Sequence, residues 1–221
     1  MSRVYWGAAI LLTIAIWLIS AWVYPQLPAE VPTHWNLEGK VDGWGHKGIA
    51  TILMPAVMTG MLLFFRFMPA LSPKSFTVDE FKSTSLYIMV IVTLLFAYLH
   101  AVILMATWQE LYHDTKFLDL GRAMLAGIFL FFALIGNVMG KIRKNFYIGI
   151  RVPWTLASDR VWNDTHRLAA WLMVGGGVLG FLMVIARTPV LLAFAVMVPV
   201  FVIPIVYSFL HYKSLERRNA L

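Results

Sequence analysis

Three histidines and one glutamate on the predicted outer side of the protein are candidate ligands for a metal ion. Neutral imidazole and carboxylate groups both suit zinc. Their spacing matches no recognised ligand motif, and a histidine between two helices or a surface His–Glu pair would explain the same residues. A metal-dependent membrane enzyme or a metal-binding sensor is therefore one open hypothesis, without an assigned metal or cofactor. The candidate ligands are His34, His100, Glu110 and His113.

Other familiar catalytic arrangements are missing from the sequence. It contains no cysteine, which excludes disulfide bonds, thiolate metal sites and cysteine nucleophiles. It contains neither His-Glu-x-x-His nor Gly-x-Ser-x-Gly, and its glycine run at 175–177 lies inside an apolar block. We therefore do not expect an enzyme.

A second concentration of polar and aromatic residues is the stretch GKIRKNFYIGIRVPWTL at 140–156. Gly149 and Pro153 bracket Arg151, so the backbone is expected to turn there. Val152 precedes proline and should therefore be extended. Ser158 is placed to cap a helix that begins at Asp159. The stretch is thus predicted to be a folded element and not a loose connection.

The helix after this stretch carries a polar stripe. Asp159, Asn163 and His166 share one face at helical spacing, with Trp162 beside them. Hydrogen bonds from this stripe, through Asp159 or Asp164, are expected to orient the Arg151 guanidinium.

The elements that position these residues must be membrane helices. The chain has 221 residues, of which 60% are hydrophobic and only 13% charged, too few charges to cover a soluble surface. Apolar blocks near the roughly 20 residues needed to cross a bilayer predict an all-α, polytopic membrane protein. The six predicted spans are 4–24, 48–68, 85–108, 121–140, 168–186 and 189–210.

The basic residues predict the orientation of these spans. Most of the 18 lysines and arginines fall on one side, so both termini are expected in the cytoplasm of a bacterial cell, with the chain in its plasma membrane. The basic balance therefore indicates topology and contact with anionic lipid, and does not indicate nucleic-acid binding. The residues on that side are Arg3, Arg66, Lys74, Lys82, Lys141, Arg143, Lys144, Arg151, Arg160, Arg167, Lys213, Arg217 and Arg218.

The opposite side carries the loop 25–47. Two turn signals, Asn36–Gly39 and Asp42-Gly43, predict a compact cap over 33–47, because Asp-Gly favours the positive dihedrals of a tight hairpin turn.

The predicted spans lack acidic residues, which makes an ion-coupled pump or transporter less expected. A transporter for a lipid or small anion remains an alternative, although its candidate residues Arg66, Arg122 and Arg187 sit at span ends, where arginine side chains commonly reach for water. Prolines in the spans are expected only to kink them.

Small residues predict how the helices meet. Gly136/Gly140 and Gly176/Gly180 are spaced for close helix packing, and Asn137 is expected to face another helix or a cavity. A homo-oligomer is compatible with this pattern, which leaves the oligomeric state open.

At this point the sequence resembles the SdpI family of bacterial membrane proteins. The resemblance lies in the run from Gly136 through Leu156, continued by Val161-Trp162-Asn163-Asp164-Thr165-His166-Arg167, and departs from the family pattern at Lys144 and Val152. Residues that it marks as structural or partner-binding are Asn137, Gly140, Arg143, Asn145, Gly149, Arg151, Pro153, Trp154, Thr155, Trp162, Thr165, His166 and Arg167.

The loop 25–47 resembles an uncharacterised N-terminal module that often precedes this core. The residues that the resemblance marks as toxin- or ligand-binding are Pro32, His34, Trp35, Asn36, Gly39 and Asp42. It divides the chain into a two-helix module at 1–69 with the cap at 25–47, and a four-helix core at 70–221 with a basic cytoplasmic loop at 141–166.

The family resemblance implies immunity to a secreted, membrane-active peptide toxin met at the outer face. In the best-known family arrangement, the toxin-bound protein also signals by holding a transcriptional repressor at the membrane. Anionic lipid, a toxin and a cytoplasmic repressor are thus the expected partners.

Overall fold

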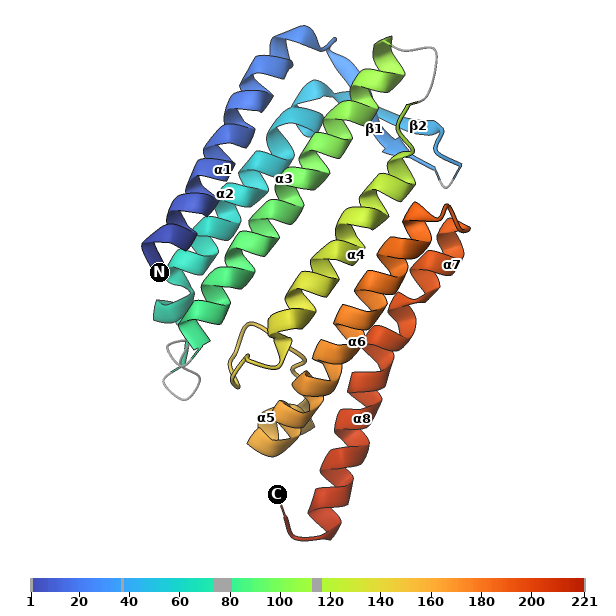
Figure 1. The fold of residues 1–221 in the computed structure, drawn as a ribbon. Coiled ribbons are helices and arrows are strands. Elements are labelled where there is room, and N and C mark those ends of the chain that lie inside the picture. Colours follow the sequence, from blue (N-terminus) through green and yellow to red (C-terminus); the bar gives the residue numbers. More distant parts are fainter. Residues whose placement is uncertain (1, 37, 74–80, 113–116, 221) are drawn as a thin grey trace. The chain divides into compact units, whose positions relative to one another are not determined.

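The chain folds into membrane-spanning helices and one small β-hairpin (Figure 1). The computed structural model describes residues 2–36, 38–73, 81–112 and 117–220. Among these residues, six helical segments are long and apolar enough to cross a bilayer, which confirms a multi-pass helical membrane protein. The elements are α1 Ser2–Val23, η1 Tyr24–Gln26, β1 Glu30–Trp35, β2 Val41–His46, α2 Lys47–Leu71, α3 Lys82–Tyr112, α4 Leu120–Met139, α5 Pro153–Ala157, α6 Asp159–Ile185, α7 Val190–Ala195 and α8 Met197–Arg217.

Contacts divide the chain into two compact units. The first unit contains Met1–Arg66 and Met89–Gly127, and the second contains Phe67–Ile88 and Ile128–Leu221. The boundaries fall inside α2, α3 and α4, so each unit takes parts of these helices. The division of the sequence into modules at residue 69 stays a prediction.

In the first unit, α1, α2 and α3 lie side by side (Figure 1). Ile16, Met58 and Ala97 form a buried cluster, one residue from each helix. The Nε2 atom of His100 lies 2.9 Å from the Ser20 hydroxyl, with both side chains buried. Because lipid tails are as apolar as the core, such polar contacts supply part of the specificity that holds membrane helices together.

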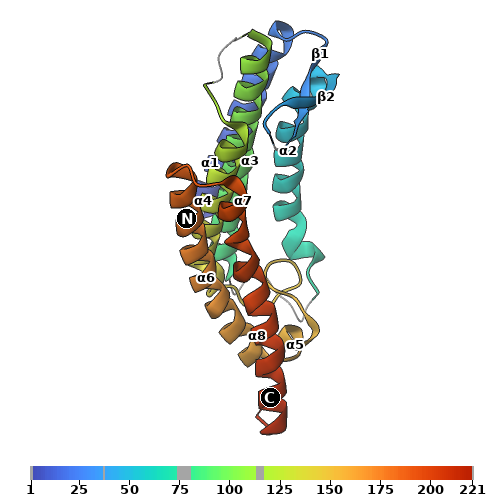
Figure 2. The same ribbon diagram turned by 90° about the vertical axis from the view of Figure 1, so that its right-hand side faces the viewer.

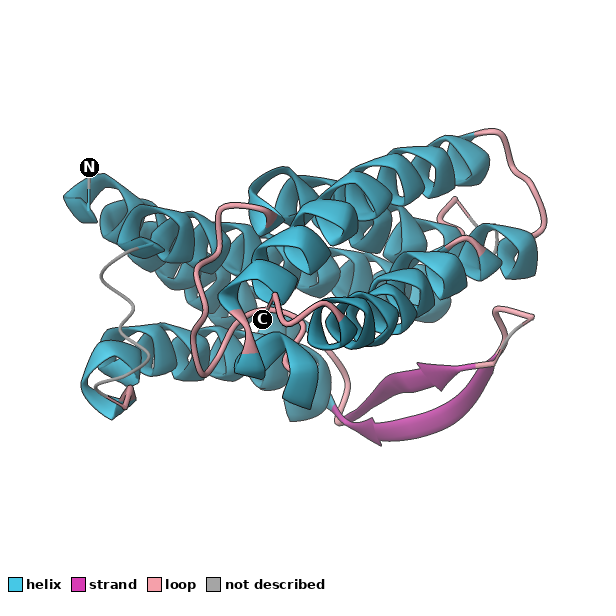
Figure 3. Ribbon diagram, turned by 90° about the horizontal axis from the view of Figure 1, so that it is seen from below, coloured by secondary structure: helices cyan, strands magenta, loops and turns pink. Residues whose placement is uncertain are grey.

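The β-hairpin joins α1 to α2 in the first unit. Its two strands pair antiparallel, with Glu30 opposite His46 and Trp35 opposite Val41 (Figure 3). Val31 is fully buried against Val23, Leu27 and Ala50, which anchors β1 to the helices. The predicted cap is therefore a real folded element.

One of the two predicted turns forms, and the other was wrong. The Asn36 carboxamide oxygen accepts hydrogen bonds from the Glu38 and Lys40 amides, both at 3.0 Å, and Gly39 has φ +72°. Asp42 and Gly43 instead lie within β2. Gly43 faces His34, and a Cβ there would come within 2.8 Å of the His34 Cβ, so this glycine allows strand pairing and not a turn.

In the second unit, glycines bring α4 against α6, as their spacing predicted. A Cβ on Gly136 would lie 2.8 Å from the Val174 amide nitrogen, and a Cβ on Gly177 would lie 2.6 Å from that of Ala133. The two backbones are therefore too close for any side chain at either position. Figure 2 shows α8 running beside α6. The missing side chain of Gly176 leaves room for Val200 of α8, whose Cγ2 would lie 2.4 Å from a Cβ on that glycine.

The last span is interrupted near its start. Helix α7 ends at Ala195 and α8 begins at Met197, with Val196 as a turn between them. Pro199 has no amide proton to donate to Ala195 and its ring crowds that carbonyl, which accounts for the break. Val196 keeps helical dihedrals (φ −59°, ψ −29°) and Val190–Arg217 still forms one candidate span, in agreement with the expectation that proline only kinks the spans. Pro204 is accommodated inside α8.

The placement expected for Asn137 was also wrong. Its side chain is exposed and does not face another helix. It lies in the last turn of α4, which ends at Met139, so its amide can be solvated at the membrane boundary.

The glycine contact predicts opposite outcomes for two neighbouring substitutions. Gly177→Ala should lower the free energy of unfolding in detergent by about 1–3 kcal/mol, because its methyl group meets backbone that cannot move aside. Gly175→Ala is the control, since a Cβ there meets nothing within 4 Å and alanine favours helix. Equal stability of the two variants, measured by thermal unfolding, would contradict the close approach.

Candidate functional site

The chain between α4 and α6, residues 140–158, folds around Asn145, which is fully buried. Its Nδ2 donates to the carbonyls of Arg143 at 2.9 Å and Ile148 at 2.8 Å. Its Oδ1 accepts from the amides of Tyr147 and Ile148, both at 2.7 Å. The carboxamide therefore uses all its hydrogen-bonding capacity to hold one tight loop.

Helix α6 holds this loop from the other side through His166 and Trp162, both fully buried and stacked with ring centroids 4.0 Å apart. The His166 Nε2 accepts from the Ile150 amide at 3.0 Å, and Nδ1 lies 2.8 Å from the Trp162 carbonyl. Because a carbonyl can only accept and an amide N–H can only donate, the proton is on Nδ1. The Trp162 indole donates to the Ile142 carbonyl at 2.8 Å.

Gly149 permits this arrangement. Its φ is +121°, a value that other residues rarely adopt, and a Cβ there would lie 2.4 Å from the His166 Nε2. Any side chain at 149 would therefore displace the imidazole from the Ile150 amide.

The short helix α5 ends the loop and ties it to α8. Val152 is extended, as predicted before proline, and Pro153 begins the helix. The buried Thr155 hydroxyl lies 2.8 Å from the Ile150 carbonyl, and accepts from the Val152 amide at 3.1 Å. The Trp154 indole donates to the Ser208 hydroxyl of α8. Ser158 then caps α6, which confirms that prediction.

The partners expected for Arg151 were wrong. Asp159 pairs with Lys144 at 2.7 Å, and Asp164 pairs with Arg167 at 3.1 Å and with His211 at 3.0 Å. Arg151 is exposed and its guanidinium lies over the Phe146 ring, 5.8 Å from the centroid. The polar stripe on α6 acts instead on the backbone, because His166 fixes Ile150, the residue before Arg151.

The thirteen residues of the inner motif thus fall into two groups. Asn145, Gly149, Pro153, Trp154, Thr155, Trp162 and His166 build the folded loop. Thr165 is buried nearby, and its hydroxyl forms no hydrogen bond with any described residue. Asn137, Arg143, Arg151 and Arg167 are exposed, and Gly140, Arg143 and Arg167 line a common cavity.

The outer motif divides in the same way. Asn36 and Gly39 make the hairpin turn, Pro32 is buried in β1, and Trp35 is half-buried. His34 and Asp42 pair across the strands, with the His34 Nδ1 2.5 Å from a carboxylate oxygen. Both of these side chains remain largely accessible to solvent.

The metal hypothesis gains no support from the described residues. None of their His, Asp and Glu side chains gather in threes or more where a metal could bind. His34 contacts Asp42 in the hairpin, and His100 contacts Ser20 between helices. His113, the remaining histidine of the proposed set, lies outside the described residues.

Spacing in the sequence did not reveal the contacts of α8 with the motif. Ser208 and His211 lie three residues apart on one face of α8. Ser208 accepts a hydrogen bond from the Trp154 indole, and His211 pairs with the Asp164 carboxylate. The available signal was a serine near the end of the predicted last span and a histidine directly after it.

Comparison with known proteins connects this geometry to a family. Residues 141–208, which hold the folded loop and most of α6 to α8, match the SdpI/YfhL protein family. Residues 11–59 match a domain of unknown function, DUF1648. The chain is 26% identical over 218 residues to the protein named Immunity protein SdpI from Bacillus subtilis (strain 168), covering 94% of this chain and 96% of that protein.

Residues 141–208 of this chain are thus similar to the SdpI/YfhL family, and nearly the whole chain is similar to one protein named for it. The resemblance inferred from the inner motif is confirmed, and the SdpI/YfhL match contains the residues that build the folded loop. No solved structure matches the chain.

The Asn145 carboxamide yields a testable consequence. Asn145→Ala should speed hydrogen exchange of the Tyr147 and Ile148 amides about tenfold or more, because both lose a buried acceptor. Asn137→Ala, which removes the same side chain from an exposed position, is the matched control and should leave these rates unchanged. Unchanged exchange in Asn145→Ala would show that another contact holds the loop.

Proposed function

We propose that this chain is a membrane immunity protein that protects its cell against a secreted, membrane-active peptide. The observation that carries the proposal is the similarity to the Bacillus subtilis immunity protein, which runs through nearly the whole of both chains. It therefore includes the spans, the hairpin and the folded loop, and not merely a shared stretch of apolar helix.

In this proposal both termini and the folded loop face the cytoplasm of the bacterium that makes this chain, and the hairpin faces outward. The support is the excess of lysine and arginine on the side that carries the termini. Three segments long enough to cross a membrane, α2, α3 and α4, separate the hairpin from the folded loop in the sequence, which supports the proposal that the two face opposite sides of the bilayer.

The hairpin is proposed to contact the toxin. It is a two-stranded sheet held to the first unit by Val31, and Trp44, His34 and Asp42 stand exposed on it. An aromatic ring beside an imidazole–carboxylate pair offers both apolar contact and hydrogen bonds to a peptide. The tight Asn36–Lys40 turn fixes these groups before binding, which lowers the entropy lost on association.

The folded loop is proposed to signal by holding a cytoplasmic repressor. Arg151 and Phe146 form an exposed cation–aromatic pair on a rigid element. Arginine and aromatic side chains are enriched among the residues that dominate protein–protein binding energy, and the folded loop presents both without further ordering.

The immunity proposal predicts survival of sensitive bacteria that express this chain when they are challenged with the peptide resisted by the Bacillus protein. His34→Ala and Asp42→Ala should each reduce survival at matched membrane levels, because each removes one half of the exposed pair. Lys40→Ala, which breaks the exposed Lys40–Glu38 pair in the same hairpin, is the control and should still protect. Killing of cells with the unaltered chain would reject immunity to that peptide, and full survival with both variants would reject the role of the hairpin.

A second experiment, in the natural host, tests signalling. In the natural host, toxin should change transcript levels in cells with the unaltered chain, and the change should be lost with Arg151→Ala while survival is kept. A response that persists in the variant would remove Arg151 from signalling, and no response in either strain would leave immunity without repressor recruitment.

A further inference from the structure

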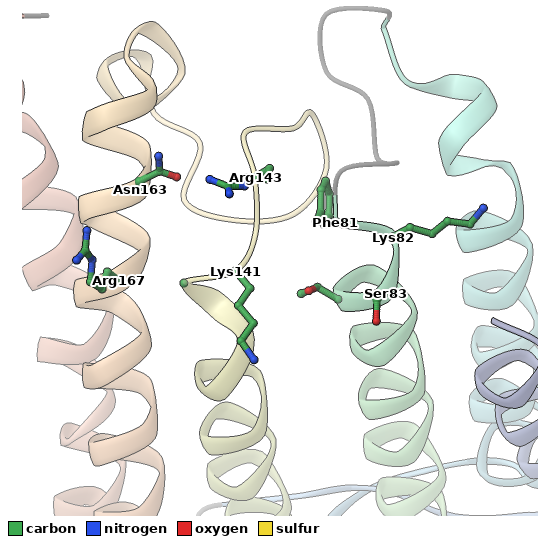
Figure 4. Close-up of a pocket in the computed structure, with 9 residues that line it drawn as sticks. Phe81, Lys82, Ser83, Lys141, Arg143, Asn163 and Arg167 are labelled. Atoms are coloured by element: carbon green, nitrogen blue, oxygen red, sulfur yellow. The ribbon is translucent and has the colours of Figure 1, made fainter. Parts of the chain in front are cut away.

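A cavity of about 700 Å³ lies within the second unit, beside the folded loop (Figure 4). Its walls come from the first turn of α3, from the end of α4 with the residues that follow it, and from α6. The lining residues are Phe81, Lys82, Ser83, Thr84, Gly140, Lys141, Arg143, Asn163 and Arg167.

The lining is strongly basic. The described residues that line it include two lysines and two arginines, and no aspartate or glutamate. Lys141 and Arg143 form no ion pair with any described residue, whereas Lys144 and Arg167 beside them do pair with Asp159 and Asp164. The like charges of Lys141 and Arg143, which no described carboxylate neutralises, repel one another, so an anion beside them would stabilise both.

The side chains also supply directed hydrogen bonds. Figure 4 shows the Arg143 guanidinium extending from the loop toward α6 on the side of Asn163, whereas the Lys82 ammonium points away. A guanidinium offers a planar fork of donors that matches a phosphate, and the Asn163 amide and Ser83 hydroxyl add neutral donors. The arrangement suits a tetrahedral oxyanion with several acceptor oxygens.

Arg143 is held in place by the folded loop. Its carbonyl accepts from the buried Asn145 Nδ2 at 2.9 Å, and Ile142 before it is bound through the Trp162 indole. Gly140 leaves space beside α6, since the nearest atom to a Cβ there would be the Arg167 Cα at 3.7 Å. The backbone that carries the Arg143 side chain is thus fixed before a ligand arrives.

The cavity lies at the membrane boundary. Lys141 lies two residues after Met139, the last residue of α4, and α3 begins at Lys82, so both flank spans at their ends. The buried Phe81 adds an apolar wall. Phosphates of lipid headgroups occupy this depth, and basic residues there attract anionic lipids.

We propose that this cavity binds one phosphate group, carried by an anionic lipid headgroup or as the free ion. The site is independent of toxin binding at the hairpin. It gives the second unit a specific anchor in the headgroup layer, fixed by Arg143 and Lys141.

Native mass spectrometry of the full chain in detergent, titrated with phosphatidylglycerol, tests this site. The double variant Lys141→Gln, Arg143→Gln should bind the lipid about tenfold more weakly, because it removes the charge-assisted donors. The double variant Lys144→Gln, Arg151→Gln loses the same charge from the same loop outside the cavity, and should bind within about twofold of the unaltered chain. Equal weakening of both variants, or unchanged binding of the cavity variant, would overturn the proposal.

Inorganic phosphate, titrated against the lipid-loaded chain, identifies the source of the phosphate. Displacement of the lipid would assign the site to the free ion, and retention would assign it to the headgroup. Gly140→Leu provides a second variant that keeps every charge and fills the cavity, so it should also lose the lipid. Normal lipid binding by a folded Gly140→Leu protein would place the lipid elsewhere and overturn the proposal.

Discussion

The His166 imidazole joins the folded loop to α6, and the functional side chains of that loop depend on this contact. One ring nitrogen accepts from the Ile150 amide and the other donates to the Trp162 carbonyl, while Trp162 stacks on the ring and binds the Ile142 carbonyl. All of this is buried, where an unpaired polar group would cost about 1–3 kcal/mol. The loop is therefore fixed to the helix at two points, Ile142 and Ile150.

That fixation separates the buried residues that build the loop from the exposed residues within one motif. The side chains that build the loop have used their hydrogen bonds internally, so they have little left to offer a partner. The exposed cations have the opposite character, since Arg143 and Arg151 make no carboxylate contact among the described residues. A rigid backbone carrying accessible arginines is what both proposed inner contacts, to a protein and to phosphate, require.

Much of this architecture could be predicted from the sequence because it follows local rules. Apolar block length predicted the six spans, small-residue spacing predicted close helix packing without identifying which helices meet, and Ser158 predicted the start of α6. Pairings that depend on distances in the folded chain could not be predicted. Asp159 and Asp164 are close to Arg151 in sequence. In the folded chain, Asp159 instead pairs with Lys144, and Asp164 pairs with Arg167 and His211.

The same reason explains the other differences. Asp42-Gly43 is a sequence typical of a turn. In the structure Gly43 instead lies in β2, paired with His34 of β1, where no larger side chain would fit. The position of Asn137 at the end of α4 allows an exposed amide that mid-span depth would forbid. The cavity could not be predicted from the sequence, because its lining residues come from three separated segments that only folding brings together.

The most direct test of this account is solid-state NMR of His166 in labelled protein reconstituted in bilayers. The account predicts a neutral ring with its proton on Nδ1, and magnetisation transfer between Nε2 and the Ile150 amide. A proton on Nε2, or no transfer to Ile150, would contradict the clamp on which the folded loop and its exposed arginines depend.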